Sequence, residues 1–215
     1  MYSKSGAESE KRKEIDMQNL VSKRVGRTNS QRPQINAQSK VFERDDRVVS
    51  IRLATPHDKG KLREMFSRLS PETIYRRFHI PYCHVPERML DLMLDVDQHA
   101  GEALLAVAEG EIVGHAMYVR LGDSSEAEMA IIIEDGWQSK GVGKLLLSEL
   151  AERARLQGIE TFTGEVLRKN RRMLGLAAMF AETDYTMKEG LCHARMPLRT
   201  LEPTSYALRT LRHAA

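Results

Sequence analysis

The chain has 215 residues, of which 41% are hydrophobic, 29% charged and 6% aromatic, and this length suits one ordinary domain with some residues left over. No apolar run approaches the roughly 18 residues that span a bilayer, and the N-terminus lacks the apolar core of a signal peptide, so we expect a cytoplasmic protein with no membrane partner. Cys83 and Cys192 stand far apart, with no CxxC pair and no Cys/His cluster, which predicts neither a disulfide framework nor a metal site.

The net charge of +3 is distributed unevenly. Residues 1–40 contain nine Lys or Arg against four acids, a net charge of +5, so the remaining 175 residues sum to −2. With only ten hydrophobic residues, this segment cannot bury enough apolar surface to offset its chain entropy. We therefore expect a disordered basic tail over residues 1–45, a folded domain over 48–198 and a C-terminal tail over 199–215. The basic tail lacks interleaved aromatic residues, so a solvated tail is a better interpretation than a nucleic-acid-binding one.

From Val48 onward the apolar pattern predicts a dense succession of elements. Thr55 and Ser70 are each followed by proline, the usual start of a helix, and the turn at Glu109-Gly110 lies between two alternating runs typical of a hairpin. The expected elements are strand 48–54, helices 57–69, 71–78 and 86–94, strands 102–108, 111–121 and 126–133, helix 143–157, strand 160–167, helix 170–182, and strands 185–190 and 191–198. This order predicts an α/β fold, with a mixed and mostly antiparallel central sheet and helices on both faces.

A glycine-rich turn separates the strand at 126–133 from the following helix. Such a turn places backbone N–H groups at the positive end of a helix dipole, where they suit a phosphate group. A Walker loop would need Lys-Ser/Thr directly after Gly141, where Val142-Gly143 stands instead. A Rossmann fingerprint would need a third glycine, which is missing after Gly143. The spacing that remains is Gln138-x-x-Gly141-x-Gly143, although glycines alone can also serve a plain tight turn.

On this motif, and on the order of elements around it, the chain resembles the GNAT acyltransferase superfamily over about residues 48–198. Asn170 stands where that family places an Asn that contacts the coenzyme, at the start of the helix after strand 160–167. The stretches RLSPETIYRRFH (68–79), DQHAGEALLAVAEGEIVGHAMY (97–118) and LRKNRRMLGLAAMF (167–180) further resemble the catalytic domain of Pat-type bacterial protein lysine acetyltransferases. The resemblance implies the GNAT fold, in which strands 126–133 and 160–167 splay apart.

The resemblance implies acetyl-CoA as cosubstrate. The backbone N–H groups of the loop would hold its pyrophosphate, and the splayed strand would offer backbone groups to the pantetheine arm. The residues expected to bind the coenzyme are Ile131, Ile132, Ile133, Gln138, Ser139, Lys140, Gly141, Val142, Gly143, Lys144 and Asn170. The side chains of the three isoleucines serve equally as core of a buried strand.

Transfer to an amine needs a group that removes a proton, because only about one lysine in a thousand is neutral at pH 7. Glu126 and Glu128 lie on one face of their strand. Glu128 stands in AEMA, matching the position where relatives carry the general base, whereas Glu126 is nearer the turn and is expected at the rim. The alternative for Glu128 is an ordinary surface acid at a sheet edge.

One departure from the family pattern affects the leaving group. Many members carry a Tyr seven residues after the Asn, but the corresponding residue here is Ala177, and Tyr185 is a weak substitute. A thiol with a pKa near ~8.5 can leave without help. The sequence thus predicts an acetyl-CoA-dependent N-acetyltransferase acting on an amine, with a protein lysine favoured over a small amine. There are two other hypotheses: a regulatory module that binds acyl-CoA without turnover, and a nucleic-acid adaptor that uses the tail. The oligomeric state stays open between monomer and homodimer.

Overall fold

The computed structural model describes residues 40–44, 47–79, 85–96, 100–180, 182–188 and 190–198. Their strands form one eight-stranded sheet in the order β1-β2-β3-β4-β5-β6-β8-β7. The elements are β1 (Lys40–Arg44), β2 (Arg47–Leu53), η1 (Pro56–Asp58), α2 (Lys59–Ser67), α3 (Pro71–Phe78), α4 (Glu87–Leu94), β3 (Gly101–Ala108), β4 (Glu111–Arg120), β5 (Glu126–Ile133), η2 (Asp135–Trp137), α5 (Val142–Leu156), β6 (Thr161–Leu167), α6 (Arg171–Ala177), β7 (Asp184–Lys188) and β8 (Leu191–Pro197).

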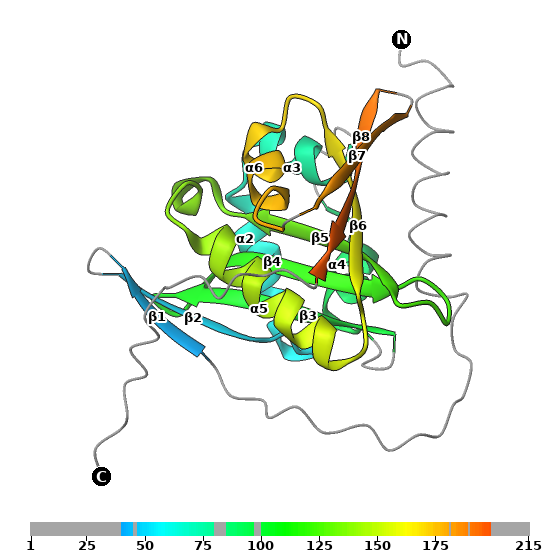
Figure 1. Cartoon of the computed structure of the whole chain (residues 1–215). Helices are drawn as coiled ribbons and strands as arrows, with labels where there is room; N and C mark the ends of the chain where they lie inside the picture. Colours follow the sequence, from blue (N-terminus) through cyan, green and yellow to red (C-terminus); the bar gives the residue numbers. More distant parts are fainter. Residues whose placement is uncertain are drawn as a thin grey trace.

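Helices cover both faces of the sheet, as predicted. Helix α5 lies along one face, and α2, α3 and α4 lie behind the other (Figure 1). The core under α5 contains Leu146, Leu150 and Phe162, while the core under α2–α4 is built on Leu62, Leu90 and Met93. The α/β architecture is therefore confirmed, with every pair of neighbouring strands antiparallel except β5 and β6.

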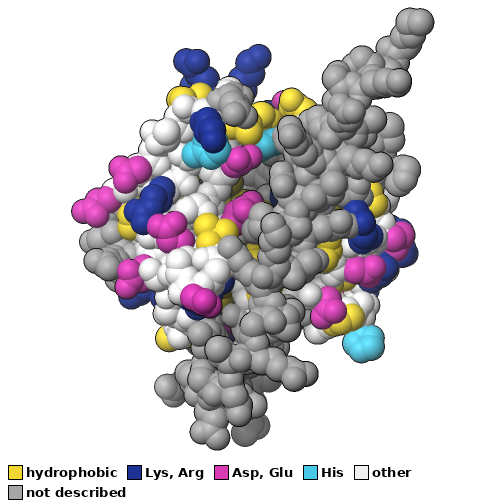
Figure 2. All heavy atoms as spheres, turned by 90° about the vertical axis from the view of Figure 1, so that its right-hand side faces the viewer, with side chains coloured by type: hydrophobic (Ala, Val, Ile, Leu, Met, Phe, Trp, Pro, Cys, Tyr) yellow, Lys and Arg dark blue, Asp and Glu magenta, His cyan; other side chains and the backbone are white. Residues whose placement is uncertain are grey.

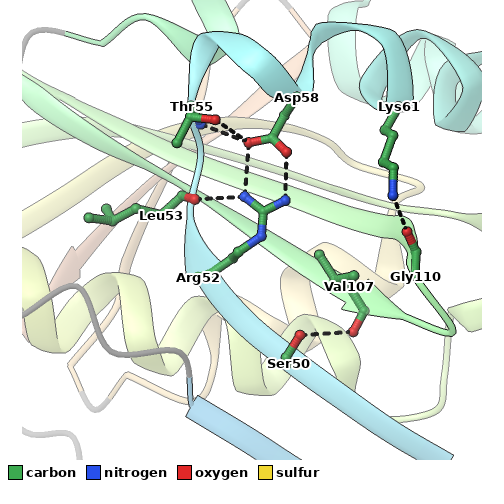
Figure 3. A network of polar contacts seen from close by, with 8 residues as sticks. All are labelled: Ser50, Arg52, Leu53, Thr55, Asp58, Lys61, Val107 and Gly110. Carbon is green, nitrogen blue, oxygen red and sulfur yellow. Dashed lines mark hydrogen bonds and ion pairs between the residues drawn. The ribbon is translucent and has the colours of Figure 1, made fainter.

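The turn between β3 and β4 follows directly from its sequence. Glu109 and Gly110 both adopt positive φ, 53° and 81°, the conformation that a two-residue hairpin turn requires to match the twist of its strands. The Lys61 ammonium of α2 donates to the Gly110 carbonyl at 2.7 Å (Figure 3). The hairpin is thus fixed both by its own turn and by the helix above it.

A buried carboxylate anchors the chain where β2 passes into the first helices. Asp58 accepts hydrogen bonds from the Arg52 guanidinium, from the Thr55 N–H at 2.9 Å and from the Thr55 hydroxyl at 2.8 Å (Figure 3). The hydrogen bond from Arg52 outweighs burial and lowers the pKa of Asp58 to about 2. The predicted helix start at Thr55-Pro56 is confirmed, although its first turn is the 3-10 helix η1.

Strands β5 and β6 separate after a short contact. They pair in parallel over Glu126–Glu128 and Thr161–Thr163 only, while β5 stays paired with β4 as far as Ile133. Beyond Glu128, the edge of β5 that faces β6 carries backbone groups that β6 does not pair. The predicted splaying of these two strands is therefore present, and it opens the sheet on the side where α5 begins.

Two boundaries differ from those expected. Residues Lys40–Arg44, placed in the tail by their charge, form β1 against β2, and Phe42 packs against the core under α5. The helix expected over 170–182 ends at Ala177, because Phe180 turns inward to 1% exposure and the Thr183 hydroxyl binds the Ala177 carbonyl.

Parts of the predicted organisation lie outside the described residues. These are residues 1–39, Cys83 and the segment 199–215. Within the part of the chain that the structure describes, no helix is both long and apolar enough to cross a membrane.

Candidate active site

The splayed strands and the start of α5 enclose a cavity of about 810 Å³. Its walls come from β5, from the loop ahead of α5, from β6, from the first turns of α6 and from the end of α3. Glu128, Ile131, Ile132, Ile133, Gln138, Ser139, Gly141, Gly143, Lys144 and Asn170, all predicted as site residues, line this one cavity. The fold therefore brings together residues separated by up to 42 positions, from Glu128 to Asn170.

The loop ahead of α5 presents its backbone to the cavity. Gly141 is the N-cap residue of α5 with φ of 84°, and Ser139 also adopts positive φ, 61°. The first backbone bond of the helix runs from the Leu145 N–H to the Gly141 carbonyl. The N–H groups of Val142, Gly143 and Lys144 thus have no helical carbonyl ahead of them, and together with the helix dipole they suit an anion.

The two glycines of the motif act for different reasons. Gly141 needs its glycine because of the left-handed backbone, where a side chain is strained. A Cβ at Gly143 would instead lie 3.2 Å from Leu176 Cδ1 and 3.6 Å from Ile133 Cγ1. Gly143 therefore permits close packing of α5 against α6 and β5.

The side chains of Gln138 and Asn170 both form hydrogen bonds within the protein. The Gln138 carboxamide donates to the Thr73 hydroxyl at 3.1 Å and to the Ile133 carbonyl at 3.0 Å, and it accepts from Arg172 Nη1 at 2.7 Å. Asn170 Oδ1 accepts from the Met173 N–H at 3.2 Å and so caps α6. Both residues line the cavity, but these contacts make them supports of its walls.

A network under Gln138 ties α3 to the loop. Asp135 accepts from the Ser70 N–H and hydroxyl, both at 2.8 Å, and from the Thr73 hydroxyl at 2.7 Å. Burial alone would raise the pKa of Asp135, but the hydrogen bonds from Ser70 and Thr73 outweigh it and lower the pKa. These hydrogen bonds join the N-terminus of α3 to the segment that leads into the glycine loop.

Lys140 and Val142 are absent from the cavity wall. The Lys140 ammonium donates to the Gly136 carbonyl and lies 5.8 Å from the Trp137 ring centre. Val142 is 2% exposed and packs in the core under α5. Any contact that these two residues make with a ligand in the cavity would come from their backbone.

The two acidic candidates on β5 are in different settings. Glu126 pairs with Arg195, whose Nε donates to Glu126 Oε1 at 3.1 Å. Glu128 is half-buried, pairs in register with Val119 on one side and Thr163 on the other, and lies at the point where β5 and β6 part. The placement of Glu128 at a cavity wall differs from that of a surface acid at a sheet edge.

Arg77 was not predicted as a site residue, and neither was His115, a buried residue outside the cavity wall on which the charge of Arg77 acts. Arg77 lines the cavity, and its Nε has no hydrogen-bond partner among the described residues. His115, wholly buried on β4, has its Nε2 2.8 Å from the Met93 carbonyl. A signal for Arg77 did exist in the sequence: with Thr73, Ile74 and Phe78 it forms the stripe at helical spacing that α3 turns inward.

A second cavity, of about 640 Å³, meets the first at Glu128, Gly164 and Glu165. Its remaining walls come from β6, β7 and β8 and include Asp184 and Tyr185. Figure 2 looks onto the side where Figure 1 draws β7 and β8, and acidic, basic and histidine side chains gather in the upper part of this face. Burial raises the pKa of Tyr185, and Cys192 adds to this effect.

Residues 63–180 match the Acetyltransferase (GNAT) family. The chain belongs to this family. Acetyltransferase PA5475 of Pseudomonas aeruginosa is 29% identical over 136 residues, which cover 61% of this chain and 73% of that protein. Acetyltransferase Pat of Mycolicibacterium smegmatis is 32% identical over 108 residues, which cover 48% of this chain but only 32% of Pat. The crystal structure of the GNAT domain of S. lividans PAT superposes with a TM-score of 0.70 at 26% identity, covering 74% of this chain and 96% of that domain.

The GNAT family assignment confirms the predicted enzyme class and donor. The protein is an acetyltransferase, and acetyl-CoA is its acetyl donor. The described residues fit this donor, because the cavity offers an anion site at α5 and an open strand edge on β5. The same residues contain no group of three or more His, Cys, Asp or Glu side chains placed to hold a metal ion.

Proposed function

We propose that this GNAT protein transfers the acetyl group of acetyl-CoA to the side-chain amine of a protein lysine, with Glu128 as general base. The observation that carries the proposal is the position of Glu128, which borders both cavities. A carboxylate at the junction of two cavities can accept a proton from a molecule in one while the acyl donor lies in the other.

The larger cavity suits acetyl-CoA. Its anion site, formed by the N–H groups from Ser139 to Lys144, would take the pyrophosphate. The edge of β5 that β6 leaves open over Ile131–Ile133 would take the amide groups of the pantetheine arm, as an added strand does, although the Ile133 carbonyl already accepts a hydrogen bond from Gln138. Arg172 lies beside this loop, bonded to Gln138, and adds a positive charge near the phosphates.

The second cavity suits an amine. Glu128, Glu165 and Asp184 lie on its walls, and of the nearby cations Arg195 is already paired with Glu126. Acidic walls attract the ammonium form in which lysine circulates at neutral pH. The similarity to Pat of Mycolicibacterium smegmatis and to the GNAT domain of S. lividans PAT supports a Pat-like acceptor, a protein lysine.

The proposed step balances as follows. The ammonium gives a proton to the Glu128 carboxylate, and the freed amine nitrogen forms a bond to the thioester carbonyl carbon. The carbon–sulfur bond breaks with its electron pair on sulfur, and the nitrogen passes its second proton to the CoA thiolate, which leaves the amide and the CoA thiol. The CoA thiolate, with an ordinary thiol pKa near ~8.5, can depart without a protein acid. This property makes the absence of a Tyr at position 177 tolerable.

The experiment that tests the function measures thiol release from acetyl-CoA in the presence of lysine peptides or small amines. We expect release with lysine peptides, with acetylation of the side-chain nitrogen located by mass spectrometry. Transfer to small amines alone would contradict the protein acceptor while leaving the enzyme class in place.

Glu128→Gln tests the base. The change should leave acetyl-CoA binding nearly intact, because the groups that would hold the donor are backbone groups of other residues. Turnover should fall by about 10²–10⁴ at neutral pH, the usual effect of losing a positioned base, and the loss should shrink as pH rises toward the pKa of the amine. Glu126→Gln is the matched control, since Glu126 lies on the same strand face but pairs with Arg195.

One observation favours a second function, that of an acyl-CoA-binding regulatory module. Ala177 is fully buried and has no polar side chain to protonate the departing thiolate. Tight binding of acetyl-CoA, combined with no thiol release on any acceptor, would favour this module over the enzyme.

A further inference from the structure

We propose that Arg77 is a positioning residue for acetyl transfer: its guanidinium holds the carboxylate of Glu128 in the ionised form at the wall of the acetyl-CoA cavity. An ionised carboxylate is the form that can accept the proton of the incoming amine. This role of Arg77 rests on the role proposed above for Glu128.

The fold places the two side chains in the same layer. Glu128 shares a face of β5 with Ala130 and Ile132, because alternate residues of a strand point the same way. Both of these neighbours belong to, or pack against, the core under α2–α4. Ile74 and Phe78 of α3 are part of that core, and Arg77 stands between them on the inward stripe of the helix. Arg77 of α3 and Glu128 of β5 therefore line the same cavity, and the charge of Glu128 acts on the Arg77 guanidinium.

The charges of this layer influence one another. Burial lowers the pKa of Arg77 to about 10, and the negative charge of Glu128 opposes that shift. Burial likewise lowers the pKa of His115 to about 4, against the hydrogen bond to Met93, and the charge of Arg77 adds to the lowering. At pH 7 Arg77 is thus a cation and His115 is neutral. A half-buried cation is stabilised by a negative charge nearby, and Glu128 provides one.

Several other charged groups near Glu128 pair with other residues or carry a negative charge, and Lys144 and Arg172 also line the cavity. Arg195 pairs with Glu126, Arg76 Nη2 lies 2.6 Å from Glu72, and His193 lies 3.7 Å from Glu165. Groups that also face this region are His79, which caps α3, the carboxylates of Glu165 and Asp184, and the neutral phenol of Tyr185. The two carboxylates would favour protonation of Glu128, and the positive charge of Arg77 opposes them.

The geometry also explains why an arginine, whose guanidinium carries several N–H donors, suits position 77. The Arg77 side chain is half-buried, its Nε is enclosed without a partner among the described residues, and its guanidinium carbon lies 5.0 Å from the Phe78 ring centre. Contact with the ring keeps the guanidinium at the cavity wall. A site that leaves a donor unsatisfied is costly for stability, which points to a functional reason for the charge.

The test follows the titration of Glu128 itself. In protein labelled with ¹³C at glutamate side chains, the carboxyl signal of Glu128 is the one that vanishes in Glu128→Gln. Loss of a positive charge at close range raises a carboxyl pKa by about one unit or more. We therefore expect Arg77→Gln to raise the Glu128 pKa by this amount. In Arg77→Lys the Glu128 pKa should return most of the way to the wild-type value, and in Arg76→Gln it should not change. Arg76 is the matched control because it precedes Arg77 and pairs with Glu72.

Activity gives the second readout. The acid limb of kcat/KM against pH, measured with a lysine peptide acceptor, should move upward in Arg77→Gln by the same amount as the carboxyl signal and return in Arg77→Lys. Melting curves show whether each variant is folded under the conditions of the assay. If Arg77→Gln does not fold, Arg77→Met replaces it in both measurements. An unchanged Glu128 pKa in a folded Arg77→Gln or Arg77→Met protein overturns the role of Arg77, whatever the activity.

The two proposals fail in distinguishable ways. A Glu128→Gln protein that keeps both its rate and its acid limb would show that Glu128 is not the base, and the positioning role of Arg77 would fall with it. A Glu128→Gln protein that loses turnover, beside an Arg77→Gln protein with an unmoved carboxyl signal, would leave the base in place and contradict only the part given to Arg77.

Discussion

Gly141 is the residue at which the backbone itself dictates the amino acid. Its φ of 84° lies in the left-handed region, and the residue forms the N-cap of α5 at the cavity wall. A side chain in this conformation costs about 1–2 kcal/mol, and a β-branched one more. Here the requirement for glycine comes from the backbone conformation, which directs the N–H groups that follow it.

We expect Gly141→Val to weaken acetyl-CoA binding by at least about tenfold, because the loop must relax away from the geometry that offers its N–H groups to the phosphates. Isothermal titration calorimetry measures the change. Gly136→Val is the matched control, since a Cβ at Gly136 meets nothing within 4 Å and the residue has no positive φ. Equal affinity in folded Gly141→Val and wild-type protein would remove the loop from the binding site.

At the scale of elements, the sequence predicts the strands and helices well where periodicity and turn residues agree. The hairpin at Glu109-Gly110 and the helix that starts after Gly141 are such cases. Strand β1 was not predicted, because its charge resembles that of the preceding tail. Its pairing with β2 also cannot be deduced from the pattern of apolar residues within the strand itself. The positions of the loop residues were likewise predictable, but the bonds of Gln138 to Thr73, Ile133 and Arg172 were not, since they join three distant segments.

A buried ion pair joins α5 to β3. Arg153 Nε donates to Glu102 Oε2, with side-chain exposures of 7% and 6%, and Glu149 lies 3.9 Å from Arg153 Nη1. Removing one partner of such a pair leaves an uncompensated buried charge. The pair therefore adds a polar contact between α5 and β3 to the apolar packing of this helix on the sheet.

We expect Arg153→Met to lower the free energy of unfolding by about 3–5 kcal/mol, measured by urea denaturation. The double variant Arg153→Met/Glu102→Leu should recover much of this loss, because the buried carboxylate of β3 goes with its partner. Arg63→Met is the control, since the exposed pair of Arg63 with Glu87 is worth at most about 1 kcal/mol. If Arg153→Met lowered the free energy of unfolding by no more than Arg63→Met does, water would have to reach Glu102.

At the scale of the whole molecule, the buried His115 couples stability to acid. Its pKa of about 4 lies below the ordinary value of 6.5 because burial disfavours the charged form. Between pH 6.5 and 4, His115 therefore binds a proton in the unfolded chain but stays neutral in the folded protein. The stabilisation is complete above pH 6.5 and is lost as pH falls toward 4.

We expect the free energy of unfolding to drop by a few kcal/mol between pH 6.5 and 4, with His115→Gln removing much of this slope. Urea denaturation across this range measures it. The contribution of Asp58, whose pKa is about 2, is lost mainly below pH 4, so the two windows separate. An identical slope in wild type and His115→Gln would mean that His115 titrates normally in the folded state.

The meeting of the two cavities at Glu128, Gly164 and Glu165 has a kinetic consequence. If acetyl-CoA binds in one cavity and the amine in the other, as proposed above, neither reactant must leave before the other enters. The proposed function therefore predicts a ternary complex of enzyme, acetyl-CoA and amine, with no acylated side chain to carry the acetyl group between substrates. The initial rates of such an enzyme, plotted in reciprocal form at several fixed concentrations of the second reactant, give lines that intersect, whereas a ping-pong enzyme gives parallel ones.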